Sequence, residues 1–188
     1  MSFHVGDTIE GYRIEAVLGE GGMGQVFRVR HMISDRREAM KIVLPLREGD
    51  QNIPERFLRE IRVLASLDHP NIVRLNTALR VGDQIAMIME LVDGASLADK
   101  LRTTGVAIAD GIRYIAQILG ALAYAHSRAV VHHDIKSANI LVMDAGVARL
   151  TGFGVAHQAD DRTLPPILRP ICGYRCRRIP TAPIRATT

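Results

Sequence analysis

"HHDIKSANIL", residues 132–141, is a polar stretch that runs into a short apolar strand. It holds Asp134, Lys136 and Asn139 at the spacing D-x-K-x-x-N. A simple turn would explain Asp134, but it leaves Asn139, five positions on, without a reason. The adjacent His132 and His133 suggest a metal site, yet neighbouring side chains rarely converge on one ion. The acid, the lysine and the amide at this spacing are therefore a strong indication of a functional site.

The first ninety residues predict a small antiparallel sheet and one helix. Five segments show strand-like alternation or a short apolar run, at residues 12–19, 25–31, 37–44, 71–80 and 84–91. Helical spacing over about 55–67 predicts a helix with Phe57, Ile61, Leu64 and Ala65 on one face. These elements form a compact first lobe.

The following residues predict a second, mainly helical lobe. A long helix is expected from about residue 109 to 128, with Ile112, Ile115, Leu119, Leu122 and His126 along one side. The polar loop quoted above then leads through a short strand and a turn into "VARL", residues 147–150. The fold class is therefore α+β.

A glycine cluster joins the first two strands. "LGEGGMGQV" places Gly19, Gly21 and Gly24 at G-x-G-x-x-G, a pattern that is weak by itself. A dinucleotide-binding turn would open a helix, whereas these glycines connect two strands. A hairpin whose backbone can approach phosphates fits better, and a flexible turn is the simpler alternative.

This order of segments resembles the protein kinase catalytic domain. "GEGGMGQV" resembles the glycine-rich loop over the ATP phosphates, and "AMKIV" places Lys41 where the family has its phosphate-holding lysine. Glu60 matches the helix glutamate that pairs with this lysine, and a solvated helix charge is the alternative. The resemblance implies a kinase-like two-lobe fold, with a five-stranded antiparallel sheet and one helix in the first lobe.

The resemblance also implies an ATP site. "MIMELVDGASL" resembles the strand and hinge between the lobes, so the backbone of Glu90 and Val92 would meet the adenine edge, with Met89 behind it as gatekeeper. The implied nucleotide-binding residues are Leu18, Gly19, Gly21, Gly24, Val26, Ala39, Lys41, Glu90 and Val92.

"HHDIKSANIL" resembles the catalytic loop H-R-D-x-K-x-x-N. The resemblance makes Asp134 the acceptor of the substrate hydroxyl proton and Lys136 the group that neutralises the moving phosphoryl group. Asn139 would bind Mg²⁺. A lysine two positions after the aspartate favours protein serine or threonine as substrate, and Lys41 and Glu60 complete the implied catalytic set.

Two positions depart from the family pattern. His133 stands where arginine is expected, which suggests regulation without a phosphate on the activation loop. Gly152 stands where the family has the aspartate of D-F-G, and glycine offers no side-chain oxygen to Mg²⁺. Metal binding is therefore weakened, and transfer should be slower by orders of magnitude.

The net charge of +4 belongs to the end of the chain. Residues 163–188 hold five arginines, no acid and five of the eight prolines, so residues 1–162 carry a net charge of −1. A shifted reading frame would produce such a change in composition. A disordered basic tail that binds nucleic acid is the rival, but it offers almost no aromatic residue for stacking.

The predicted organisation is an extension at 1–11, a first lobe at 12–90, a partial second lobe at 91–162 and a disordered tail at 163–188. No A-P-E motif or later helix is recognisable, so the long helix should keep an uncovered apolar patch. Neither a secretory signal nor an apolar run of membrane-spanning length is visible, which favours the cytoplasm. Three interpretations stay open: a serine/threonine kinase, a pseudokinase that binds nucleotide or a partner protein, and a remnant without function.

Overall fold

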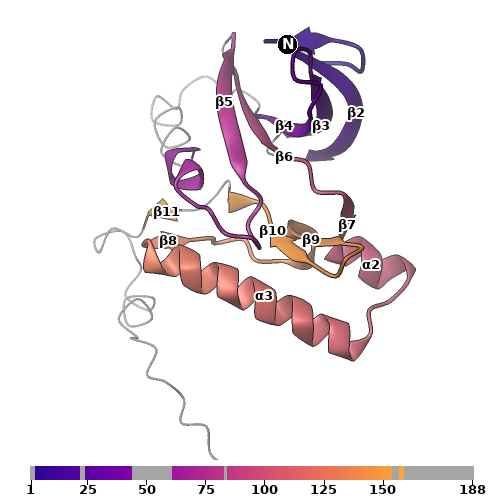
Figure 1. Cartoon of the computed structure of the whole chain (residues 1–188), viewed down its shortest axis with the longest axis vertical. Coiled ribbons are helices and arrows are strands. Elements are labelled where there is room, and N and C mark those ends of the chain that lie inside the picture. Colours follow the sequence, from indigo (N-terminus) through magenta and orange to yellow (C-terminus); the bar gives the residue numbers. More distant parts are fainter. Residues whose placement is uncertain (1–2, 22–23, 44–60, 83, 154–156, 159–188) are drawn as a thin grey trace, which may run out of the picture. The chain divides into compact units, whose positions relative to one another are not determined.

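The computed structural model describes residues 3–21, 24–43, 61–82, 84–153 and 157–158. Its larger sheet is antiparallel throughout and has the strand order β1-β2-β3-β4-β6-β5 (Figure 1). The strands are β1 (Thr8–Ile9), β2 (Tyr12–Gly21), β3 (Gly24–His31), β4 (Arg37–Val43), β5 (Leu75–Val81) and β6 (Gln84–Glu90). The five predicted strands of the first lobe are thus confirmed.

Two details of the larger sheet differ from the sequence-based expectation. A short strand, β1, pairs with the start of β2 and adds a sixth strand, because Glu10 and Gly11 turn the chain with positive φ angles of 46° and 83°. β5 begins at Leu75 instead of residue 71. The preceding residues leave the larger sheet, and Ile72 forms an isolated parallel bridge with Leu150.

The two faces of the larger sheet have different surroundings. On one face, Phe27, Val29, Met40, Ile42 and Ile88 belong to a buried cluster, which we call the sheet core. The alternation of side chains along a strand directs Val26 and Lys41 to the opposite face. That face also carries Met87, which packs in a second buried cluster.

The second cluster, which we call the lower core, lies between one long helix and short strands. The helices are α2 (Leu97–Thr103) and α3 (Ile108–Ser127). The strands are β7 (Gly94–Ser96), β8 (Val130–Val131), β9 (Ile140–Met143), β10 (Ala148–Leu150) and β11 (His157–Gln158). They form the sheet β10-β9-β7 and the pair β11-β8, and a single 3-10 turn at Ser137–Asn139 precedes β9. α3 runs beside this set of strands (Figure 1).

The buried side of α3 is only in part the side that the sequence pattern marked, because of the marked residues Leu122 packs against the lower core. The helix buries Tyr114, Ile118, Ala121 and Ala125. Ile112, Ile115 and Leu119, on the marked side, are 64%, 58% and 60% exposed. α3 has apolar residues on both sides, so periodicity alone did not determine which side packs. The exposed side agrees with the expected uncovered apolar patch.

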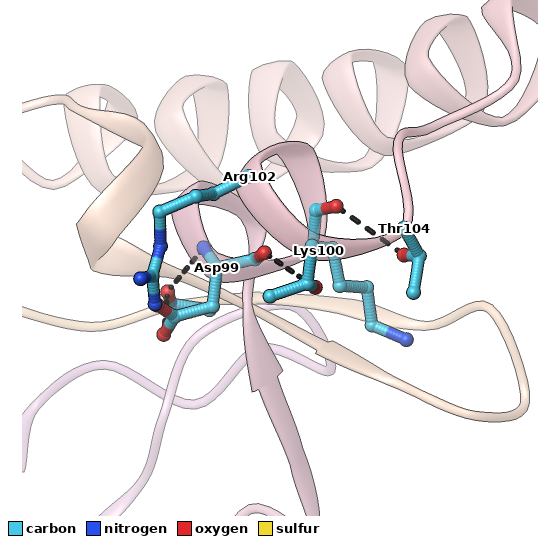
Figure 2. A network of polar contacts seen from close by, with 6 residues as sticks. Asp99, Lys100, Arg102 and Thr104 are labelled. Atoms are coloured by element: carbon cyan, nitrogen blue, oxygen red, sulfur yellow. Dashed lines mark hydrogen bonds and ion pairs between the residues drawn. The ribbon is translucent and has the colours of Figure 1, made fainter.

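α2 was not predicted from the sequence, and it has hydrogen bonds at both ends. Ser96 caps the first turn, since its hydroxyl accepts from the Asp99 N–H at 3.0 Å and donates to the Asp99 carboxylate at 2.7 Å. Figure 2 shows Arg102 against Asp99, and Thr104 against the Lys100 carbonyl at the other end. The S-x-x-D spacing is the signal that would have located this helix.

The helix predicted over 55–67 is present where the structure describes it, at residues 61–65. Val63, Leu64 and Leu67 are buried there, whereas Ala65 is exposed. Residues 55–60 lie outside the described residues, as does the predicted tail at 163–188. Residues 1–158 form one compact unit. Among the described helices, none combines the length and apolar character that crossing a membrane requires.

Candidate active site

Asp134 lies at the centre of a hydrogen-bonded loop. Its Oδ2 is 2.8 Å from Lys136 Nζ and accepts from Asn139 Nδ2 at 3.0 Å. The same amide also donates to the Asp134 carbonyl at 2.7 Å. Hydrogen bonds from Lys136 and then from Asn139 hold the pKa of Asp134 below its ordinary value. The carboxylate is therefore ionised at neutral pH and can accept a proton.

His132 supports this loop from the interior. It is only 1% exposed, its Nε2 is 3.0 Å from the Thr151 carbonyl, and its Nδ1 accepts from the Asp134 N–H. The centroid of its ring lies 4.4 Å from the centroid of the Phe153 ring, in an edge-to-face arrangement. Burial, outweighing the bond to Thr151, lowers the pKa of His132, so the imidazole is neutral. Sequence reasoning assigned His132 no role, because a motif does not reveal burial.

Gly152 lies directly against Asn139. The Thr151 N–H donates to the Asn139 carbonyl at 2.9 Å, which brings the two segments together. A Cβ at Gly152 would come within 2.8 Å of Asn139 Cγ and 3.0 Å of its Oδ1. Gly152 also has φ of 86°, which glycine adopts without strain. The asparagine amide thus occupies the space that any side chain at position 152 would need.

His133, which replaces the expected arginine, also has an uncommon backbone. Its φ of 63° lies in the left-handed region, where histidine is more frequent than most residues. His133 is exposed, whereas His132 is buried. The two adjacent histidines therefore have different surroundings.

The residues implied for nucleotide binding come from neighbouring strands. Val26 pairs with Lys41, and Lys41 with Met87, so these side chains form a row across three strands. Ala39 pairs with Met89 in the next row. These two rows place apolar side chains beside the Lys41 ammonium group on the face opposite the sheet core, and Arg28 pairs with Ala39 in the second row.

The glycine-rich turn and the helix glutamate are only partly described. A register shift between Val17 and Gly19 leaves Leu18 without a partner in β3, and Leu18 is 49% exposed. Gly21 pairs with Gly24, which has φ of 126°. Glu60 lies outside the described residues, so its pairing with Lys41 stays a prediction.

The hinge predicted at Glu90 and Val92 follows β6. The Glu90 N–H donates to the Arg74 carbonyl at 2.9 Å, so this N–H is already engaged. Within the described part of the chain, neither backbone group of the half-buried Val92 has a hydrogen-bond partner. Arg149, which sequence reasoning missed, donates to the Glu90 carboxylate at 2.6 Å.

A hollow of about 370 Å³ opens beside the hinge and not over the Asp134 loop. Its wall is formed by Asp68, His69, Pro70, Ile72, Arg74, Asn76, Glu90 and Arg149. None of the residues implied for phosphate or metal binding lines this hollow, whereas Glu90, which is implied for adenine, does.

Comparison with known proteins agrees with this geometry. The protein kinase domain model matches residues 12–174. The serine/threonine-protein kinase PknJ of Mycobacterium tuberculosis is 39% identical over 163 residues, covering 85% of this chain and 28% of that protein. PrkC of Bacillus subtilis is 35% identical over 162 residues, covering 85% of this chain and 25% of that protein. The chain thus spans about a quarter of the length of these relatives.

A solved structure shows the same fold. The crystal structure of the PknI kinase domain from Mycobacterium tuberculosis matches with a TM-score of 0.73 and 29% identity, over 85% of this chain and 65% of that one. This confirms the kinase-like α+β fold. The family match includes the glycine-rich turn, Lys41 and the Asp134 loop. This chain therefore belongs to the protein kinase domain family.

Proposed function

We propose that this chain is an ATP-binding domain of serine/threonine kinase type in which metal-dependent phosphoryl transfer is strongly weakened. The contact between Gly152 and Asn139 is the observation that carries this proposal. Protein kinases bind ATP and Mg²⁺ and act on protein substrates. Protein serine or threonine, or a partner protein recognised without chemistry, is the proposed macromolecular ligand.

The nucleotide side of the site fits ATP. Val26 and Ala39 supply apolar area for a base, and Lys41 lies in the same cross-strand rows. Its ammonium would bind the α- and β-phosphates, as the resemblance implies. Gly24 has no side chain to keep phosphates away, and the backbone groups of Val92 have no hydrogen-bond partner among the residues that the structure describes. These features support nucleotide binding independently of a metal.

The loop side supplies the groups for proton and charge transfer. Asp134 is ionised, and its carboxylate is 35% exposed, so a substrate hydroxyl can reach it. Lys136, 2.8 Å from this carboxylate, would neutralise charge on the transferred group. Both roles follow the family pattern, and the assembled geometry supports them.

The same residues do not fit Mg²⁺ well. A hard divalent cation prefers several oxygen ligands, with carboxylates among them. Here Asp134 is paired with Lys136, Asn139 directs its Nδ2 toward Asp134, and Gly152 contributes no side-chain oxygen. No group of three histidine, cysteine or acidic side chains that could hold a metal occurs among the described residues. Each ~1.4 kcal/mol of lost stabilisation slows transfer about tenfold.

Restoring the carboxylate tests this proposal. Gly152→Asp should make the ATP-induced rise in Tm depend on Mg²⁺ and should raise phosphate transfer to a serine/threonine peptide at least tenfold. Gly152→Asn is the matched control, because it adds the same Cβ and no charge. Both variants should lower the free energy of unfolding by about 1–3 kcal/mol in metal-free buffer, since Asn139 must move and φ is positive.

The second candidate is an active kinase, and the assembled Asp134, Lys136 and Asn139 loop favours it. Robust Mg²⁺-dependent phosphate transfer by the unmodified chain, lost in Asp134→Asn, would establish an active kinase. It would contradict the proposal that transfer is strongly weakened. ATP binding that is insensitive to Mg²⁺, without transfer, is the expected result. A folded chain that binds no nucleotide would leave the remnant interpretation.

A further inference from the structure

The hinge segment is held at both ends by the small sheet β10-β9-β7. Residues 91–93 have no regular structure and connect the end of β6 to the start of β7. Glu90, before them, contacts β10 through its side chain, and Gly94, after them, pairs with β9. Both anchors therefore belong to one sheet, although Glu90 comes from a different one.

The first anchor is a charge-assisted hydrogen bond between residues 59 positions apart. Arg149 Nη1 lies 2.6 Å from Glu90 Oε2, and the two side chains are 21% and 34% exposed. Such bonds are stronger than neutral ones, and partial burial reduces screening by salt. Together with the bond from the Glu90 N–H to Arg74, it restrains Glu90 from both the backbone and the side chain.

The second anchor is a close backbone contact that only glycine permits. Gly94 pairs with Met143, and an ideal Cβ at Gly94 would lie 2.4 Å from the Val142 carbonyl oxygen. That atom is backbone in a central strand, so it cannot move aside as a flexible side chain could. β7 therefore approaches β9 more closely than a residue with a side chain would allow.

We propose that Arg149 is a positioning residue that, together with Gly94, pre-forms the hinge edge for an adenine base. The proposal rests on the proposed nucleotide binding. Between the anchors, the Val92 N–H can donate to adenine N1, and the Glu90 carbonyl can accept from the adenine amino group. Guanine presents the reverse pattern at these positions. Holding the edge rigid before binding reduces the ordering that binding otherwise requires.

A ratio of affinities separates positioning from a general structural role. In Arg149→Met, the ATP affinity should fall about tenfold, as expected for loss of a hydrogen bond to a charged group, while the GTP affinity changes little. The ATP-to-GTP ratio therefore falls. If Arg149 had only a general structural role, its substitution would weaken the binding of ATP and of GTP equally. Both affinities are measured by calorimetry on the full chain without Mg²⁺.

Arg74→Met is the matched control. Arg74 lines the same hollow, but its side chain has no hydrogen bond or ion pair within the described residues. Its substitution should leave both affinities unchanged. Because Arg149 is also on the wall of the hollow, its loss should not open the cores. Should Arg149→Met fail to fold, Glu90→Gln removes the charge and keeps the shape, with the same expected ratio.

Exchange of the charges provides the rescue. Glu90→Arg alone should behave like Arg149→Met, and the double variant Glu90→Arg with Arg149→Glu should recover most of the ATP preference. An unmodified chain that prefers ATP, together with an Arg149→Met variant that keeps the same preference, would overturn the positioning role alone. An unmodified chain that binds neither nucleotide would overturn the proposed function, and the hinge proposal with it.

Discussion

The neutral, buried His132 links three segments of the candidate active site. It contacts the Thr151 carbonyl, the Asp134 N–H and the ring of Phe153. A proton on this ring would have to be buried with it, because the side chain is 1% exposed. Asp134 opposes this cost, while His133 and Lys136 add to it. Burial is the largest cause, so protonation of His132 should work against folding.

The stability of the chain should therefore fall in mild acid. The unfolded state takes up a proton near the ordinary pKa of 6.5, whereas the folded state does so at lower pH. The contribution of neutral His132 to the free energy of unfolding should be fully present above about pH 6.5. The free energy of unfolding should decrease as the pH falls below this value. Urea denaturation at a series of pH values between about 7 and 5 measures this slope.

The His132→Gln variant is the test at this position. It removes the titrating group, so it should flatten the slope, whatever its effect on absolute stability. Equal slopes in the unmodified chain and in His132→Gln would contradict this account.

At the scale of elements, α3 shows how a helix can be apolar on two sides. Its buried side packs on β8 and β10, with Ile118 4% exposed and Ala121 and Ala125 fully buried. The other side leaves Ile115 and Leu119 more than half exposed. Contiguous exposed apolar residues of this kind favour self-association.

Substitutions on the two sides should have opposite consequences. Ile118→Ala should lower the free energy of unfolding by about 2–5 kcal/mol, because it leaves a cavity in the lower core. The double variant Ile115→Gln with Leu119→Gln should change it by less than about 0.5 kcal/mol and should reduce self-association. Urea denaturation and sedimentation velocity measure the two effects. A large loss of stability in the double variant would mean that this side of α3 is covered.

The N-terminal cap of α2 should contribute less to the free energy of unfolding than the buried side of α3 does. Ser96→Ala removes the acceptor for the Asp99 N–H and should cost about 1 kcal/mol. Ser96→Asp, which keeps an acceptor at the cap, should cost less. Thermal denaturation of both variants would show whether the cap, and not the volume of the side chain, carries the effect.

At the scale of the whole unit, strand β6 joins the two cores. Ala86 and Ile88 face the sheet core, while Met87 between them belongs to the lower core. The backbone of Leu150, from the lower core, also bonds to Asn71 and Val73, which lead into β5. A strand shared by two cores transmits the loss of one to the other.

Residues 1–158 should accordingly unfold in one transition. Phe27→Ala in the sheet core and Leu150→Ala in the lower core should both shift that single transition, each by about 2–5 kcal/mol. Far-UV circular dichroism and tyrosine fluorescence should give coincident curves. Two separate transitions, with Phe27→Ala moving only one, would show that the cores are independent.

The sequence by itself determined the fold class and the order of the main elements. Strand alternation, the glycine-rich turn and the D-x-K-x-x-N spacing are local patterns, and local patterns determine elements and their order. They placed the five long strands, α3 and the Asp134 loop. They also identified Gly152 as a position without the expected carboxylate.

Only the tertiary structure decided which groups meet. The sequence could not show which side of α3 is buried, since both sides are apolar. It could not show that Asn139 occupies the space beside Gly152, or that Arg149 reaches Glu90 across 59 residues. These contacts depend on how separate segments pack in space, and packing brings together residues whose spacing along the chain carries no signal.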